Sequence, residues 1–285
     1  VIKKLLRVPY IKFINYVLTL KHDKKYECRK YLGKDYKVIR GTIRSTNDYD
    51  EAWLLFLCQE ARIVFDIGCN IGQSTLLIAS SKSLKKLVLV EPNPYSLSNA
   101  AENLILNNQS QNIIFIPKAA YNISGKMIQL WTMHGSFSGA STNIDFTKTG
   151  TISKNYIDVQ TITLDDIAKT YDIYPDLVKI DVEGAENYVL EGASEIANKG
   201  GTIFFVEVHS CKNMSIVENT DKILDWCKQN NFKAFYLCEH KEINDSSPIE
   251  GRGRYHLLLM HKNKKYPEGL CEIKQSDNIN NININ

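Results

Sequence analysis

Short apolar runs alternate with amphipathic stretches of about ten residues from residue 62 onward, and this alternation limits the possible folds more than any other feature. The apolar runs, which read as strands, fall at 62–66, 87–90, 113–116, 177–180 and 202–208. The stretches with helical periodicity fall at 74–80, 95–107, 164–170 and 185–198. Such alternation predicts an α/β fold whose mostly parallel sheet is covered by helices on both faces.

The sequence on either side of this pattern is less regular. A helix is expected at 50–60 and another at 219–229, with additional strands at 36–40 and 126–131. Two closely spaced apolar runs, at 232–237 and 255–261, form a final strand pair. Because strands this close in sequence usually pair without a crossover, we expect one antiparallel strand in the sheet.

Charge is distributed unevenly along the chain. Residues 1–60 contain 13 Lys and Arg against 7 Asp and Glu, whereas residues 61–285 contain 22 against 25. The body of the chain therefore lacks the basic footprint of a nucleic-acid-binding protein, and we expect no nucleic acid partner. Residues 1–25 mix basic and apolar side chains, which predicts either a helix packed on the main domain or a peripheral contact with a membrane or a neighbouring domain.

The domain organisation predicted from these patterns has three parts. A basic extension covers 1–50, one large domain covers 51–270, and a low-complexity tail at 271–285 is expected to be disordered. No run of 18 apolar residues is present, which excludes a membrane-spanning helix of that kind. The seven cysteines include no C-x-x-C pair and no signal peptide is recognisable, so we expect reduced thiols and a cytoplasmic location, with peripheral membrane contact as an addition.

The stretch VFDIGCNIG at 64–72 is the clearest sign of a ligand site. It follows a strand, opens a helix and has the spacing D-x-G-x-N-x-G rather than G-x-G-x-x-G. Gly68 and Gly72 permit a tight turn and close approach of the backbone to a ligand. Because Asp66 would repel a pyrophosphate, this turn suits S-adenosylmethionine, which has a sulfonium and no phosphate.

Glu91 strengthens this interpretation. It ends the second strand, about 23 residues after Gly68, where an acid can bind both ribose hydroxyls. NAD shares this requirement for an acid, but the third glycine of its fingerprint is absent here. The sequence Asn93-Pro94-Tyr95 resembles the N-P-P-Y motif of nucleic-acid amino methyltransferases, but it follows the wrong strand and lacks one Pro, so it reads as a turn before a helix.

Together these residues resemble the FkbM family of S-adenosylmethionine-dependent methyltransferases over roughly residues 36–210. The family pattern usually has Ala where this chain has Cys69. The strongest marker is DLVKIDVEGAE within 176–193. The resemblance also rests on VFDIGCNIGQSTLLIA at 64–79, LVEPNPYSLSNAAENLILNN at 89–108, KAAYNISGK at 118–126, SFSGAST at 136–142, VQTITLDDI at 159–167 and IFFVEVH at 203–209.

The resemblance implies a Rossmann-like class I methyltransferase fold with a seven-stranded sheet, and O-methyl transfer to a hydroxyl of a sugar, glycan or glycosylated metabolite. It does not identify the acceptor. It also implies a set of cofactor-binding residues, namely Asp66, Gly68, Asn70, Gly72, Glu91, Asn93, Ala119 and Ala120.

Four polar residues follow the ends of two apolar strands and are candidates for catalysis: Asp181, Glu183, Glu207 and His209. Ligands bind beyond the carboxyl ends of parallel strands, and neighbouring strands lie about 5 Å apart, so these side chains can share one pocket. A hydroxyl acceptor needs a general base or a metal ion. His209 or Asp181 is the expected base, and Asp181 with Glu207 is an alternative Mg²⁺ site.

The Ser- and Thr-rich loop after residue 135 is the expected acceptor contact, through Ser136, Ser138 and Ser141. Two other functions remain open at this stage. One is an NAD-dependent sugar-modifying enzyme. The other is a non-catalytic module that binds a glycan or a partner within a larger assembly, although Asp66, Gly68, Gly72 and Glu91 argue against it.

Overall fold

The computed structural model describes residues 25–44, 48–131, 156–211 and 214–282. The predicted contact segment at 1–25 and the three predicted acceptor serines therefore lie outside the described residues, except for Lys25. Within the described residues, no helix has both the length and the apolar character needed to cross a membrane.

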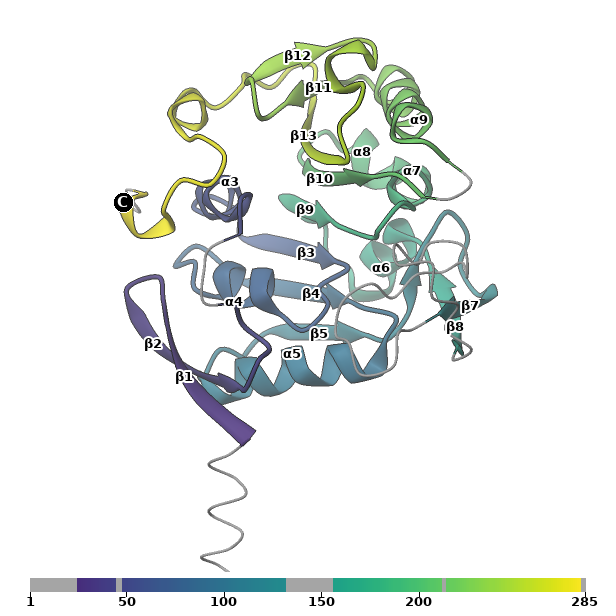
Figure 1. The fold of residues 1–285 in the computed structure, drawn as a ribbon. Helices are drawn as coiled ribbons and strands as arrows, with labels where there is room; N and C mark the ends of the chain where they lie inside the picture. The colour runs from purple at the N-terminus through teal and green to yellow at the C-terminus, as the bar shows by residue number, and fades with distance from the viewer. Residues whose placement is uncertain (1–24, 45–47, 132–155, 212–213, 283–285) are drawn as a thin grey trace, which may run out of the picture.

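An eight-stranded sheet forms the centre of the molecule (Figure 1). Its spatial order is β12-β11-β13-β10-β9-β3-β4-β5. The strands are β3 (Ile63–Ile67), β4 (Lys86–Val90), β5 (Ile113–Ile116), β9 (Leu177–Ile180), β10 (Ile203–His209), β11 (Phe232–Tyr236), β12 (Lys241–Ile243) and β13 (Arg254–His261).

The strand order creates a switch point in the middle of the sheet. From β3 the chain adds β4 and β5 on one side, and it later returns to add β9 and β10 on the other, all in parallel. Between β3 and β9, successive connections leave in opposite directions, which opens a crevice at the carboxyl ends of these strands. β13 runs antiparallel to both β10 and β11, as the sequence predicted for one strand.

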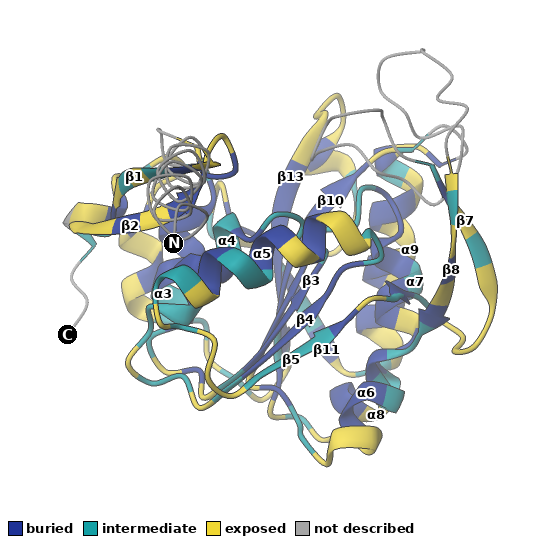
Figure 2. Cartoon of the chain, turned by 90° about the horizontal axis from the view of Figure 1, so that it is seen from below, coloured by how far each residue is buried: buried dark blue, intermediate teal, exposed yellow. Residues whose placement is uncertain are grey.

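Helices cover both faces of the sheet and complete a three-layer sandwich (Figure 2). On one face the helices are α3 (Glu51–Leu57), α4 (Gln73–Ala79) and α5 (Pro94–Leu106). On the other they are α6 (Leu164–Tyr171), α7 (Glu186–Glu191), α8 (Ser194–Asn198) and α9 (Ile216–Gln229). The strands are apolar on both sides because each face packs on its own helical layer, giving two large apolar clusters.

Local sequence explains where several helices begin. Asn93 accepts a hydrogen bond from the backbone N–H of Tyr95, and Pro94 occupies the first turn of α5. Thr163 caps α6 in the same way, and Ser215 with Glu218 forms a reciprocal capping box on α9. These caps fix the points at which the chain leaves the strand ends and enters each helix.

The structure differs from the predicted elements in four places. A short eighth strand, β12, pairs with β11, and the helix expected at 185–198 is divided at Gly192 into α7 and α8. The strand expected at 126–131 joins a separate small sheet, and the one at 36–40 belongs to a hairpin. The small sheet contains β6 (Ala119–Ala120), β7 (Met127–Trp131) and β8 (Tyr156–Ile162); the hairpin contains β1 (Tyr26–Tyr31) and β2 (Lys34–Ile39).

The tail expected to be disordered instead packs on the domain as far as residue 282. It contains short 3₁₀ turns at Glu268–Glu272 and Ile279–Asn281, and the side chains of Ile273 and Ile279 are buried. The indole N–H of Trp53 on α3 donates a hydrogen bond to the Ile273 carbonyl at 2.9 Å. The prediction of disorder is therefore wrong for 271–282, because isolated isoleucines in a polar sequence find a buried site on α3.

Candidate active site

Two clefts meet at the switch point of the sheet. The first, here called the β4 cleft, is lined by Ile67, Gly68, Asn70, Val90, Glu91, Pro92, Ser96, Ala119, Ala120, Leu130, Asp181, Val182, Glu183 and Ala185. The second, the α3 cleft, is lined by Gly41, Thr42, Arg44, Asp48, Asp50, Glu51, Leu54, Gly68, Cys69, Asn70, Ile71, Gln73, Ser74, Lys179, Asp181 and Glu207. Gly68, Asn70 and Asp181 line both.

The turn after β3 is held so tightly that only glycine fits at its centre. Gly68 has a φ of +81°, and a Cβ there would lie 1.8 Å from the backbone oxygen of Asp181. Its N–H donates to the Val90 carbonyl at 2.8 Å. The turn therefore presses against the ends of both neighbouring strands, β4 and β9, and exposes its backbone to the β4 cleft.

Glu91 projects into the β4 cleft and is fixed by the backbone around it. Its two carboxylate oxygens accept hydrogen bonds from the backbone N–H groups of Asn70 and Asn93, at 3.0 and 2.9 Å. Burial raises the pKa of Glu91 to about 7, although these two hydrogen bonds oppose the shift. The position fits the predicted ribose-binding acid.

Three of the eight predicted cofactor residues do not line this cleft. Asp66 is fully buried on the face of the sheet that packs on α4, where Thr75 Oγ1 donates to it at 2.7 Å and Lys179 Nζ lies 3.7 Å away. Gly72 begins α4 against Ala100, and Asn93 caps α5. These three residues support the turn and the two helices that follow it, whereas Gly68, Asn70, Glu91, Ala119 and Ala120 line the β4 cleft.

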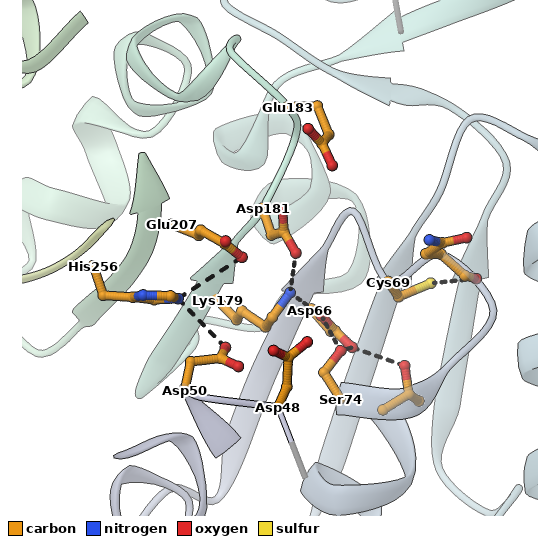
Figure 3. Close-up of polar contacts among 12 residues, drawn as sticks. Asp48, Asp50, Asp66, Cys69, Ser74, Lys179, Asp181, Glu183, Glu207 and His256 are labelled. Carbon is orange, nitrogen blue, oxygen red and sulfur yellow. Dashed lines mark hydrogen bonds and ion pairs between the residues drawn. The ribbon is translucent and has the colours of Figure 1, made fainter. Parts of the chain in front are cut away.

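Asp181 lies at the junction of the two clefts (Figure 3). Its carboxylate is 3.3 Å from Nζ of Lys179, a residue that is 4% exposed. Burial raises the pKa of Asp181 to about 6, and the ammonium of Lys179 opposes that shift. Burial likewise disfavours the charge on Lys179, but Asp181 and Asp66 outweigh it and raise the pKa of this lysine, which stays protonated.

Glu207 forms the far wall of the α3 cleft, and three donors gather on one of its two oxygens. Tyr49 donates its hydroxyl hydrogen to Oε1, Arg254 Nη1 lies 3.2 Å from the same atom, and His209 Nε2 lies 3.4 Å from it. Burial alone would raise the pKa of Glu207, but the hydrogen bond and charge of His209 and the hydrogen bond from Tyr49 lower it. The carboxylate is therefore ionised.

The structure argues against His209 as the base. The side chain is 1% exposed and lines neither cleft. Its Nδ1 is 3.3 Å from Glu186, a fully buried carboxylate. Burial disfavours the protonated ring, but Glu186 and Glu207 outweigh it and raise the pKa of His209 to about 11. A ring that already carries its proton cannot accept another, so His209 acts here as a charged brace behind Glu207.

Among the side chains that the structure describes, two groups place ligand-type atoms within 4.8 Å of one another. Asp181, Glu207 and His209 form one, which contains the predicted Mg²⁺ pair, and Asp50, Glu207 and His256 form the other. Glu183, the fourth predicted catalytic residue, lines the β4 cleft and has a φ of +56°, a strained conformation for a residue other than glycine.

Sequence reasoning missed Tyr49, Asp50, Arg254 and His256. Asp50 comes just before a helix and reads as an ordinary capping acid, while Arg254 and His256 lie in the final strand pair. The register of β10 on β13 places Glu207 opposite His256 and His209 opposite Arg254. Nothing in the local sequence encodes this register, although alternate polar residues in an otherwise apolar strand were a signal that could have been followed.

The strand order, the glycine turn and the acid after β4 define a class I S-adenosylmethionine-dependent methyltransferase fold. Consistently, the family model of the methyltransferase FkbM domain matches residues 66–234. The chain belongs to this family, and the family and fold support S-adenosylmethionine-dependent methyl transfer. None of the curated proteins compared with the chain matches it.

Solved structures with similar backbones include an FkbM methyltransferase from Methylobacillus flagellatus, with 16% identity and a TM-score of 0.47 over 70% of this chain and 44% of that one. A putative rRNA methylase from Clostridium thermocellum has 11% identity and a TM-score of 0.47 over 78% and 100%. An O-methyltransferase from Bacillus cereus in complex with SAH has 15% identity and a TM-score of 0.42 over 75% and 80%. The chain spans less than half of the Methylobacillus protein, and similarity at this level leaves the substrate open.

Proposed function

We propose that the protein methylates a hydroxyl of a sugar, a glycan or a glycosylated metabolite. The observation that carries the proposal is the position of Asp181, a carboxylate that lines both the β4 cleft and the α3 cleft. One cleft offers a place for the methyl donor and the other a place for the acceptor, with a potential base between them.

The residues of the β4 cleft fit S-adenosylmethionine. Gly68 leaves room for close backbone approach, and Glu91 offers a carboxylate for the ribose hydroxyls. Among the described residues that line this cleft, none is basic, which suits a cofactor without phosphate better than NAD. Bound there, the cofactor would supply an electrophilic methyl group.

The α3 cleft fits a polyhydroxylated acceptor. Its wall combines carboxylates, an amide and hydroxyls, among them Asp48, Gln73, Ser74 and Thr42, which together can donate to and accept from several sugar hydroxyls. In transfer, the acceptor oxygen forms a bond to the methyl carbon as the carbon–sulfur bond breaks, and Asp181 accepts the hydroxyl proton. Lys179, 3.3 Å from Asp181, holds that carboxylate in place.

Radiolabelled S-adenosylmethionine incubated with a panel of sugars, sugar nucleotides and cell glycans tests the proposal. Parallel reactions with EDTA and with added Mg²⁺ test the alternative in which Asp181 and Glu207 hold Mg²⁺. Asp181→Asn should lower turnover about 100-fold or more, because the substitution removes the base and keeps the shape of the side chain. The affinity for S-adenosylhomocysteine (SAH), measured by calorimetry, should stay within a few-fold of the wild-type value. Label transfer to no hydroxyl compound, or full activity of Asp181→Asn, would refute the assignment.

A thermal-shift assay with SAH and with NAD distinguishes the methyltransferase from the two alternative functions. Stabilisation by SAH alone supports the methyltransferase. Stabilisation by NAD alone would favour the NAD-dependent sugar-modifying enzyme, and stabilisation by neither would favour a non-catalytic binding module.

A further inference from the structure

His256, in the middle of the polar cluster beside the α3 cleft, faces two carboxylates without a well-formed hydrogen bond to either. The side chain is buried, with 2% of the residue exposed, and neither ring nitrogen makes a hydrogen bond to a described residue. Its Nε2 faces Asp50 Oδ2 at 3.4 Å and Glu207 Oε2 at 3.8 Å (Figure 3). Because an unsatisfied buried nitrogen costs about 1–3 kcal/mol, such an arrangement calls for a partner.

One oxygen of each carboxylate faces this ring. Asp50 occupies the N-cap position of α3, yet its side chain accepts no capping hydrogen bond from the helix. In Glu207, the contacts from Tyr49, Arg254 and His209 all go to Oε1, which leaves Oε2 facing His256. Three ligand-type atoms from three different elements therefore converge on one point.

The spacing of these atoms is that of ligands around an ion. Hydrogen bonds from nitrogen to oxygen usually span about 2.7–3.2 Å, which is shorter than either separation at His256. Ligands bound about 2.0–2.2 Å from a tetrahedral metal lie about 3.3–3.6 Å from one another. Of the two observed separations, 3.4 Å lies within that range and 3.8 Å lies 0.2 Å above it.

We propose that Asp50, Glu207 and His256 bind a divalent first-row transition metal ion at the wall of the α3 cleft. One imidazole with two carboxylates suits Mn²⁺, Fe²⁺ or Zn²⁺ better than Mg²⁺, which prefers oxygen ligands alone. Aromatic neighbours hold the imidazole in this orientation. The ring stacks on Phe205 with centroids 5.0 Å apart, and Tyr49 and Trp53 flank it at 5.4 and 5.8 Å.

The neighbouring group of Asp181, Glu207 and His209 is the weaker candidate, because both of its carboxylates already face a lysine or arginine side chain. Lys179 lies 3.3 Å from Oδ2 of Asp181, and Glu186 lies 3.3 Å from Nδ1 of His209. The oxygen of Glu207 nearest to His209 is also the one that receives Tyr49 and Arg254. A cation placed there would displace these contacts, whereas one beside His256 would displace none of them.

The site would also deepen the proposed function, and this part of the inference rests on that function. Asp50 and Glu207 line the α3 cleft, so an open coordination position would face the acceptor. A hydroxyl bound to the metal would lose its proton more easily, which would assist Asp181.

Calorimetric titration of chelator-treated protein with Mn²⁺ tests the site. Mn²⁺ is the probe because the exposed thiols of Cys28, Cys238 and Cys271 would compete for Zn²⁺. We expect one saturable site in the wild-type protein, and at least a ten-fold loss of affinity in His256→Phe, which keeps the aromatic packing, and in Asp50→Asn, which keeps the shape. His261→Phe, the same substitution on the same strand, should bind as the wild type does.

His209→Asn separates the two candidate groups. The proposal requires Mn²⁺ affinity in this variant to stay within about three-fold of the wild type, and it is overturned if the affinity falls as far as in His256→Phe. It is also overturned if the wild-type protein shows no saturable Mn²⁺ binding. Circular dichroism and SAH binding report whether each variant is folded. Mn²⁺ binding is measured without turnover. A protein that binds no Mn²⁺ could therefore still be a methyltransferase, and a protein that transfers no methyl group could still bind Mn²⁺ at this site.

Discussion

The sequence predicts both Asp66 and Glu91 as cofactor ligands, but the structure places these two residues in different surroundings. Glu91 follows the last residue of β4 and reaches the β4 cleft, whereas Asp66 lies within β3 and points to the helical layer. Both were predicted to bind the cofactor, but of the two only Glu91 lines the β4 cleft. The direction of the side chain depends on strand alternation near the end of β3, where a shift of one residue changes the face.

Glu91 should make cofactor binding depend on pH. Because burial raises its pKa to about 7, the carboxyl is mostly protonated at pH 6 and mostly ionised at pH 8. Only the ionised form accepts hydrogen bonds from both ribose hydroxyls, so we expect SAH affinity to rise up to about ten-fold over this range. Calorimetric titration with SAH at several pH values measures this change in affinity. Glu91→Gln should bind more weakly and lose this dependence, while any titration of the ligand's own amino group would affect both proteins equally.

Asp66→Ala should affect stability more than cofactor affinity. The substitution removes the hydrogen bonds from Ser74 and Thr75 and one of the two carboxylates near the buried ammonium of Lys179. Breaking a buried charged group of this kind costs about 3–5 kcal/mol. Urea unfolding measures the loss, and SAH titration of the folded fraction should give an affinity within a few-fold of the wild type. Unchanged stability combined with lost SAH binding would restore Asp66 as a direct ligand.

At the scale of elements, the turn between β3 and α4 joins the two clefts. Gly68 and Gly125 both have a φ near +80°, but a Cβ at Gly125 would meet nothing within 4 Å, whereas one at Gly68 would overlap the Asp181 carbonyl. An alanine at position 125 would therefore introduce backbone strain alone, whereas an alanine at position 68 would introduce the same strain together with a steric overlap.

We expect Gly125→Ala to cost about 1 kcal/mol of unfolding free energy, the usual penalty for a left-handed alanine. Gly68→Ala should cost several times more and abolish SAH binding, because the ends of β3 and β9 must move apart to admit the methyl group. Thermal unfolding and SAH calorimetry on both variants provide the comparison. Similar effects of the two substitutions would mean that the contact with Asp181 is not what demands glycine.

Much of this level of structure could be predicted from the sequence. Apolar runs bounded by turns predicted every strand from β3 to β5 and from β9 to β11. Of the polar residues predicted at their carboxyl ends, Asp181, Glu183 and Glu207 line the clefts, whereas Asp66 and His209 are buried away from them. The pairing of β10 with β13 could not be predicted, because it joins positions such as Glu207 and His256 that are 49 residues apart. The missed part of the site consists of residues brought in by that pairing and by the start of α3.

In the molecule as a whole, the carboxyl-terminal segment, residues 268–282, lies beside α3, which immediately precedes the first strand of the central sheet (Figure 1). Leu270, Ile273 and Ile279 are buried in the same apolar cluster as Trp53. The backbone N–H of Ser276 donates to the carbonyl of Tyr49 at 2.9 Å. The segment therefore supports the start of α3, and with it Tyr49 and Asp50 at the wall of the α3 cleft.

Truncation after Pro267 should consequently damage the acceptor side of the site more than the cofactor side. Burial of an aliphatic side chain contributes about 1.5–3 kcal/mol, offset in part by the entropy of ordering the chain, so we expect a net loss of about 3 kcal/mol. SAH affinity should stay within a few-fold, since no residue of the segment lines the β4 cleft. The acceptor KM should rise, because Asp50 and the ring of Tyr49 lose their support.

A chain ending at residue 282 is the matched control, since it removes only the last three residues and keeps Ile273 and Ile279. Urea unfolding, SAH calorimetry and methyl-transfer kinetics on both truncations measure the three effects separately. If the shorter chain lost SAH affinity and acceptor affinity to the same degree, the segment would be a general stabiliser. A selective rise in acceptor KM would instead show that a stretch of low-complexity sequence, distant from every recognised motif, sets the geometry of the α3 cleft.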